Sequence, residues 1–152
     1  MKIRYLALAG IILFFGGCKQ FDEGPLLSLY SVEKRVAGRW YFDRVIYDGV
    51  DSTQNYQYGQ IEFIYDTKKK YGAFSWSHNI MTPIGPENFE GGIWRFIADK
   101  DSLEMVFIDL LTADTTRHWK WKINRCAYTE FWLERTIRDT VKIEWELWKW
   151  AM

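Results

Sequence analysis

The feature that most constrains the fold is an alternation of apolar and polar residues with a period of two, which runs from Arg39 almost to the end of the chain. Successive side chains of a strand point to opposite faces, so this period predicts strands that each bury one face. The residues that share one face of each segment are, in chain order, Trp40, Phe42, Arg44 and Ile46; Ile61, Phe63 and Tyr65; Phe74 and Trp76; Ile93, Arg95 and Ile97; Leu103, Met105 and Phe107; Arg117, Trp119, Trp121 and Ile123; Phe131 and Leu133; and Val141, Ile143, Trp145 and Leu147. The sequence therefore predicts an all-β fold of eight strands.

Most connections between these segments are short and turn-like, such as Asn124-Arg125, and one longer loop covers residues 78–90. Strands joined in this way favour an antiparallel meander. Eight strands are enough for such a sheet to close, with an interior that is filled by side chains or holds one small ligand. We therefore predict an eight-stranded antiparallel up-and-down barrel. A two-sheet sandwich is the alternative architecture.

One stretch before the strands has a helical pattern. Its apolar residues, at spacings of three and four, are Leu26, Leu29, Val32 and Val36. They form one apolar stripe, and Gly38 follows as a stop signal. The pattern predicts a short N-terminal helix within residues 26–37 that packs on one end of the barrel.

The first residues of the chain have the order of a secretory signal. A basic start with Lys2 and Arg4 precedes an apolar run over residues 5–15, and two glycines lead to Cys18. The run is shorter than the roughly 20 residues that a membrane-spanning helix needs. Cleavage before Cys18 removes both basic residues from the 20 basic and 20 acidic residues of the chain, and the remainder has a formal charge of −2. That balance gives no basic excess to attract nucleic acid.

Residues 15–18, Phe-Gly-Gly-Cys, resemble the lipobox of bacterial lipoproteins, in which a small residue precedes an invariant cysteine. The resemblance implies that residues 1–17 are a signal peptide and that acyl chains on Cys18 anchor the protein to a membrane. Residues 18–27 are then a lipidated N-terminus and tether. Lys19 is not the aspartate that commonly retains lipoproteins at the inner membrane, which implies the outer membrane, on its periplasmic or cell-surface face. The alternative is an ordinary signal with a chance cysteine.

The tripeptide Gly38-Arg39-Trp40 opens the first expected strand. Gly-x-Trp in this place resembles the first signature of lipocalins, and together with eight strands and a lipobox it makes residues 28–152 similar to the lipocalin-like lipoproteins of Gram-negative bacteria. The resemblance implies that Gly38 and Trp40 plug the closed end and that the interior binds a small apolar or amphipathic ligand. The Thr-Asp-Tyr motif and the arginine after the last strand are missing, and Lys149 is a candidate to replace that arginine as a cation over the Trp40 ring.

The sixth segment gives the firmest assignment of faces. Burying Lys120 and Lys122 on one face would be far more costly than burying Trp119 and Trp121 on the other. Arg117 lies on the tryptophan face. An apolar wall with one guanidinium suits an amphipathic ligand with an acidic head, such as a fatty acid.

We place Arg95 and Trp145 in the same candidate ligand-binding group. Arg44 and Arg95 have apolar or aromatic residues two positions away on each side, and Arg117 has Trp119 on one side. Each arginine faces either the interior, where Asp109 or an anionic ligand would pair with it, or solvent, with its stem over aromatic rings. The alternative for the whole interior is that aromatic side chains fill it. The protein would then be a non-enzymatic accessory subunit of an outer-membrane protein complex.

No combination of residues points to catalysis, to a metal site or to a cofactor. The two histidines are His78 and His118, and neither has a second ligand at metal-binding spacing. Cys126 has no histidine near it in the sequence, so we expect it to be a small buried hydrophobe and not a nucleophile. We therefore expect a protein that is not an enzyme.

Anchoring is predicted to depend on Cys18, because the apolar run is too short to span the membrane and is removed with the signal. We expect Cys18→Ala to abolish metabolic labelling with radioactive palmitate and most of the association with the membrane fraction. Full retention of both in the variant would contradict the lipoprotein interpretation.

Overall fold

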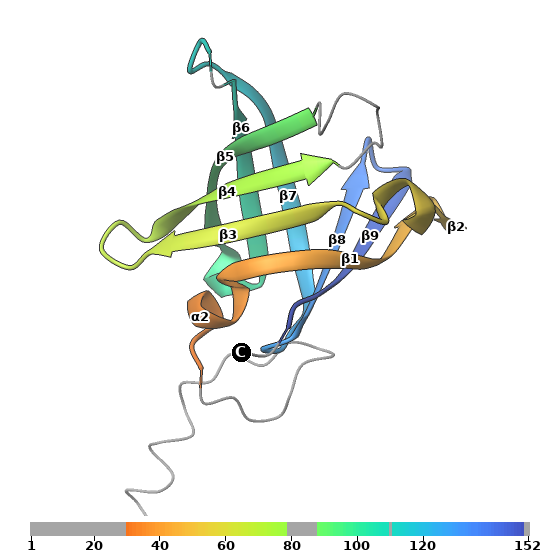
Figure 1. Ribbon diagram of the computed structural model, residues 1–152, viewed down its shortest axis with the longest axis horizontal. Helices are drawn as coiled ribbons and strands as arrows, with labels where there is room; N and C mark the ends of the chain where they lie inside the picture. Colours follow the sequence, from red (N-terminus) through yellow and green to blue (C-terminus); the bar gives the residue numbers. More distant parts are fainter. Residues whose placement is uncertain (1–29, 79–87, 110, 151–152) are drawn as a thin grey trace, which may run out of the picture.

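The computed structural model describes residues 30–78, 88–109 and 111–150, and in them the chain forms one closed barrel (Figure 1). The elements are α2 (Val32–Val36), β1 (Gly38–Tyr47), β2 (Val50–Asp51), the 3₁₀ turn η1 (Thr53–Tyr56), β3 (Gln60–Asp66), β4 (Tyr71–His78), β5 (Asn88–Ile97), the 3₁₀ turn η2 (Ala98–Lys100), β6 (Ser102–Ile108), β7 (Thr115–Cys126), β8 (Glu130–Ile137) and β9 (Val141–Trp148). Within these ranges, no helix is long and apolar enough to cross a membrane.

The barrel closes because β1 pairs with β3 on one side and with β9 on the other. Each remaining long strand pairs antiparallel with its neighbours in the sequence. The two-residue strand β2 pairs only with the end of β1 and extends it into a small hairpin. The prediction of an eight-stranded antiparallel up-and-down barrel with a short N-terminal helix is confirmed, and the two-sheet sandwich is wrong.

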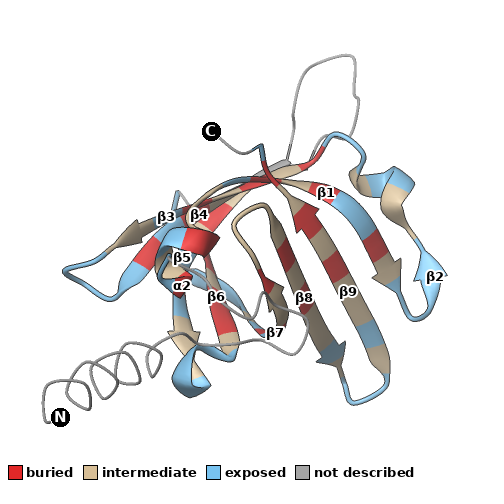
Figure 2. Ribbon diagram, turned by 90° about the horizontal axis from the view of Figure 1, so that it is seen from below, coloured by how far each residue is buried: buried red, intermediate tan, exposed pale blue. Residues whose placement is uncertain are grey.

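The inward faces carry most of the buried apolar residues, which alternate with exposed or half-buried ones along the strands (Figure 2). The expected faces are buried in β3, β6 and β8. In β7, Trp121 and Ile123 are buried while Lys120 and Lys122 are exposed, as the sequence predicts. Aromatic rings dominate this core, and together they fill the interior of the barrel.

The half of β1 that follows Phe42 departs from the predicted face because the strand contains a bulge. Phe42 and Arg44 oppose consecutive residues of β9, which leaves Asp43 as an extra residue. After the bulge Val45 points inward and Arg44 outward, where Arg44 forms an ion pair of 3.3 Å with Glu146. The expectation that Arg44 and Ile46 share the face of Trp40 is therefore wrong.

A second bulge lies in β7, where the sequence suggested a turn. Ile123 and Arg125 oppose Leu133 and Trp132, so Asn124 is the extra residue and β7 continues to Cys126. The shift in parity turns Cys126 into the core, where it is fully buried. The predicted turn at Asn124-Arg125 is wrong, and the connection to β8 comes after Cys126.

In β5 the structure decides between two faces that are both apolar. Trp94 is fully buried, while Ile93 is 38% exposed and Arg95 lies on the outer wall. Arg95 there donates to Glu104 of β6 at 2.6 Å. The face that holds Ile93, Arg95 and Ile97 is therefore the outer one.

The helix α2 begins after Ser31, whose hydroxyl accepts a hydrogen bond from the backbone N–H of Lys34 at 3.3 Å. Val32 and Val36 of the predicted stripe are buried against the barrel. The other two residues of the stripe, the signal peptide at 1–17 and the tether at 18–27 lie outside the described residues. The long loop begins later than predicted, because β4 reaches His78 and β5 starts at Asn88.

Gly72 in β4 allows a close approach between the wall and an inward indole. The Trp94 Nε1 atom donates to the carbonyls of Ile64 at 3.1 Å and Ala73 at 3.0 Å. A Cβ atom on Gly72 would lie 1.9 Å from the Ile64 carbonyl oxygen and 2.5 Å from the Trp94 Nε1 atom. Only glycine fits there without moving the backbone of β3.

We expect Gly72→Ala to lower the free energy of unfolding by about 1–3 kcal/mol or more, because backbone and indole must both shift. Gly91→Ala is the matched control, since its Cβ would meet nothing closer than the Phe74 carbonyl oxygen at 3.2 Å. Urea denaturation of both variants measures the difference. Equal stability of the two variants would contradict the contact at Gly72.

Candidate functional site at the open end of the barrel

Within the described residues, different elements lie at the two ends of the barrel. The helix α2 lies at the end where β1 starts and where β7 and β9 finish (Figure 1). We call this the closed end. The opposite end, which we call the open end, carries the start of β7, the end of β8 and the turn η1. The resemblance to lipocalins implies a plug at the first end and ligand entry at the second.

Trp40 lies at the closed end and is fully buried. Its Nε1 atom donates to the Val36 carbonyl at 2.7 Å, and its ring centroid is 5.5 Å from that of Phe131. Gly38 precedes it with a φ of 126°, a conformation that favours glycine. The indole therefore ties the helix to the floor of the barrel, in the place where the resemblance implies a plug.

Lys149 covers the other side of this indole. Its Nζ atom lies 4.5 Å from the Trp40 ring centroid and donates to the carbonyls of Arg35 at 2.7 Å and Ala37 at 2.9 Å. The ammonium thus satisfies carbonyls at the end of α2, which helices commonly leave without an intrahelical partner. Lys149 therefore lies as a cation over the Trp40 ring.

The titratable groups of the closed end have strongly shifted pKa values. Burial lowers the pKa of Lys149 to about 8. Burial raises the pKa of the Cys126 thiol to about 12, so the thiol stays protonated at neutral pH. A protonated, fully buried thiol is a poor nucleophile, which agrees with a packing role for Cys126.

Four aromatic side chains meet in the open half of the barrel: Phe107, Trp119, Trp121 and Trp145. The Trp121 and Trp145 ring centroids are 4.2 Å apart, and those of Phe107 and Trp119 are 4.5 Å apart. Trp119 links the two pairs, with its centroid 6.1 Å from that of Trp145. These rings fill the centre of the barrel.

Two guanidinium groups stack on the outer layer of this aromatic cluster. The Arg117 Cζ atom is 4.3 Å from the Phe107 ring centroid, and Arg117 forms an ion pair of 2.5 Å with Glu90. The Arg135 Cζ atom lies 4.2 Å from the Trp119 ring centroid. Burial, and then the positive charge of Arg117, lower the pKa of Arg135. Arg117 and Arg135 therefore stand near two carboxylates at this end, Glu90 in the ion pair and Asp109 on the turn after β6.

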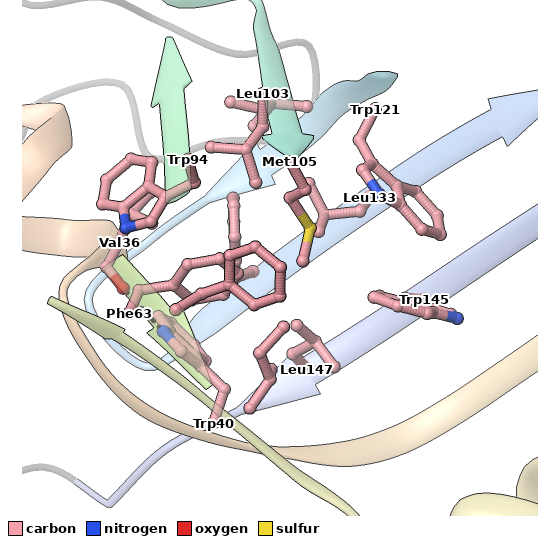
Figure 3. Close-up of a cluster of buried hydrophobic side chains, with 14 of the residues drawn as sticks. Val36, Trp40, Phe63, Trp94, Leu103, Met105, Trp121, Leu133, Trp145 and Leu147 are labelled. Carbon is pink, nitrogen blue, oxygen red and sulfur yellow. Dashed lines mark hydrogen bonds between the residues drawn. The ribbon is translucent and has the colours of Figure 1, made fainter. Parts of the chain in front are cut away.

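Three buried N–H donors of this region have no hydrogen-bond partner within the described residues. They are the Nε1 atoms of Trp121 and Trp145 and the Nη1 atom of Arg135. Figure 3 shows Trp145 with its nitrogen at the end of the ring turned away from Leu147 and Phe63. An unsatisfied buried donor costs about 1–3 kcal/mol, so an acceptor that enters the mouth would relieve a real penalty.

A hollow of about 290 Å³ opens beside Arg117, and Glu90, Phe107 and Asp109 are among its other lining residues. Asp109 does not pair with an arginine, contrary to the expectation from the sequence. Its carboxylate accepts hydrogen bonds from the backbone N–H groups of Leu111 at 2.8 Å and Thr112 at 3.1 Å. These bonds lower the pKa of Asp109 and fix the turn between β6 and β7.

The structure brings together four of the five residues in the candidate ligand-binding group: Arg117, Trp119, Trp121 and Trp145. It leaves out the fifth, Arg95, because that side chain lies on the outer wall, so its assignment to an interior site is wrong. The sequence analysis also missed Arg135. Arg135 has the same pattern of flanking apolar residues as Arg95, because Leu133 and Ile137 lie two positions away on either side.

Other chemistries find no support in the part of the chain that the structure describes. No group of three or more His, Cys, Asp and Glu side chains in it is arranged to hold a metal ion. His118 is exposed on the outer wall, and the side chain of His78 lies outside the description. The open end carries two guanidinium groups stacked on an aromatic cluster.

The comparisons with known proteins do not assign a family. No protein-family model matches the chain, and no curated protein matches it. Among solved structures, the chain is similar to a redesigned β-barrel, with 15% sequence identity, coverage of 82% of this chain and 100% of that chain, and a TM-score of 0.49. The description of the barrel rests on the strand pairings themselves.

The buried ammonium of Lys149 predicts a rise of stability with pH. Its pKa is about 8 in the folded state against 10.5 for the ordinary group, so between these pH values the unfolded chain binds more protons. The free energy of unfolding therefore increases as the pH rises through this window. Above pH 9.0 the Cys126 thiol acts in the opposite direction, because only the unfolded thiol ionises there.

We expect urea denaturation to give a higher free energy of unfolding at pH 9 than at pH 7.5. Lys149→Met should flatten this rise, since it removes the group that titrates. The variant should also be less stable overall, because two buried carbonyls lose their donor. The same slope in both proteins would mean that the folded ammonium stays charged over this range.

Proposed function

We propose that this chain is a lipid-anchored, lipocalin-like barrel of the cell envelope that binds an amphipathic molecule through an acidic head at its open end. One observation carries the proposal. The Arg135 guanidinium stacks on Trp119 beside Arg117, and its buried Nη1 atom has no hydrogen-bond partner among the described residues. The anchor rests on the resemblance of residues 15–18 to a lipobox.

The charge and geometry of the mouth favour an anion. A carboxylate accepts two parallel hydrogen bonds from a guanidinium, and such charge-assisted bonds are stronger than bonds between neutral groups. Glu90 pairs with Arg117 at 2.5 Å, so Arg135 is the guanidinium that remains for the ligand.

The packing of the interior limits where the apolar part of the ligand lies. Because the rings of Trp119, Trp121 and Trp145 already contact one another, the apolar part rests against the aromatic layer at the mouth. Trp119 is only partly buried and offers its exposed edge for this contact. This arrangement suits a short-chain amphiphile better than a long fatty acid that needs a deep channel.

The test is a titration of the full-length protein, held in lipid nanodiscs, with octanoate and with octanol while tryptophan fluorescence is recorded. We expect octanoate to bind more tightly than octanol. Arg135→Gln should weaken octanoate binding roughly 10- to 100-fold, since it removes a charge-assisted hydrogen bond of about 1.5–3 kcal/mol. Arg44→Gln is the matched control on the outer wall and should leave binding unchanged.

A second candidate function is favoured by the aromatic filling of the barrel. If the rings leave no room for a ligand, the barrel is an accessory subunit of an outer-membrane protein complex. That candidate predicts no fluorescence response to octanoate or octanol. It also predicts a stoichiometric protein partner in native mass spectrometry of the protein purified from its own membrane.

A further inference from the structure

The closed end carries an exterior surface of aromatic side chains that the core does not need. We define the closed-end aromatic surface as Tyr30, Tyr41, Tyr128, Trp148 and Trp150. The rings of Tyr30 and Tyr128 stack with centroids 5.0 Å apart. Trp148 contacts Tyr41 at 5.3 Å and Trp150 at 4.9 Å between centroids. Trp150 is 71% exposed and Tyr30 43% exposed, although exposure of large aromatic groups to water is unfavourable.

Cationic groups accompany these rings. The Lys34 Nζ atom lies 4.2 Å from the Tyr30 ring centroid, and the Lys149 Nζ atom lies 4.8 Å from that of Tyr128. A hollow of about 410 Å³ runs between them, and Lys34, Arg39, Tyr41 and Trp150 are among its lining residues. Glu62 is the carboxylate in this lining, and Arg39 forms an ion pair of 3.6 Å with it. The surface therefore has a positive balance.

The position of the surface along the chain connects it with the anchor. Tyr30 stands directly before Ser31 and α2, at the closed end. Cys18 precedes Tyr30 by twelve residues. A fully extended segment of that length spans at most about 40 Å. Acyl chains on Cys18 would keep this end of the barrel within that distance of a bilayer.

We propose that the closed-end aromatic surface docks on the lipid headgroups of the membrane that holds the acyl chains. Tryptophan and tyrosine favour the boundary between headgroups and hydrocarbon, where the ring is apolar and its polar tip stays hydrated. Lys34 and Arg39 then face lipid phosphates. The docking rests on the proposed lipid anchor, because the tether makes a weak contact intramolecular and so raises its effective concentration.

This docking fixes the orientation of the barrel. With the closed end on the membrane, the mouth with Arg117 and Arg135 faces the aqueous side. A free-floating barrel on the same tether would present its mouth in all directions. A protein partner on the aromatic surface is the competing occupant. The hollow that mixes aromatic edges with cations at the end nearest the anchor fits a lipid surface better.

The experiment uses the full-length acylated protein reconstituted in vesicles of phosphatidylethanolamine and phosphatidylglycerol, in which part of the acyl chains carry bromine. Bromine quenches the fluorescence of a tryptophan side chain that reaches the interface. We expect clear quenching of the wild-type protein and loss of most of it in Trp148→Ala/Trp150→Ala. Trp132→Phe is the matched control, because Trp132 lies on the outer wall outside the defined surface, stacked by Arg125. Trp150→Ala alone guards against misfolding, since that side chain is largely exposed.

Two further measurements distinguish a failure of the docking from a failure of its premise, the lipid anchor. Intact mass of the protein reports the acyl chains, and flotation with the vesicles reports anchoring. An acylated protein that floats without quenching would overturn the docking and leave the anchor standing. A protein without acyl chains would overturn the premise and the docking with it. Quenching that Trp148→Ala/Trp150→Ala leaves unchanged, or a stoichiometric protein that shields Trp150 in the native membrane, would also overturn the docking.

Discussion

The pairing of β1 with β9 is the constraint on which the rest of the structure depends, because it closes the sheet and gives the chain an inside. Once eight strands close, the interior has a fixed and small width. Every residue on the inner face must then fit against residues from the opposite wall. Large aromatic rings meet this requirement here by packing edge to face, as Trp76 and Trp145 do with centroids 5.2 Å apart.

Buried hydrogen-bond donors at the two ends of the barrel differ in whether they have an acceptor. At the closed end Trp40 and Lys149 each find backbone carbonyls, so burial of these donors is compensated and the helix is held in place. At the open end the buried donors of Trp121, Trp145 and Arg135 have no such acceptor among the described residues. Hydrogen bonds to backbone carbonyls therefore distinguish the closed end from the open end.

This polarity links the proposals for the two ends. An anchor and an aromatic surface at the closed end would orient the barrel, and the orientation would present the cationic mouth to solvent. An anion that approaches along the aqueous side would meet Arg117 and Arg135 first and the aromatic layer next. In these proposals the barrel attaches to the membrane at one end and binds an anion at the other. The two ends are separated by the length of the strands.

The sequence by itself determined the eight long strands and the inward face of β7, because alternation is a local property and Lys120 and Lys122 exclude one face. The pairing of β1 with β9 decided that these strands close into a barrel and do not form a two-sheet sandwich. Only the tertiary structure decided the inward direction of Val45 and Cys126, since a bulge is defined by the partner strand that lacks the extra residue. It also decided that Arg135 joins Arg117 at the mouth. Those residues lie on neighbouring strands whose register no local pattern specifies.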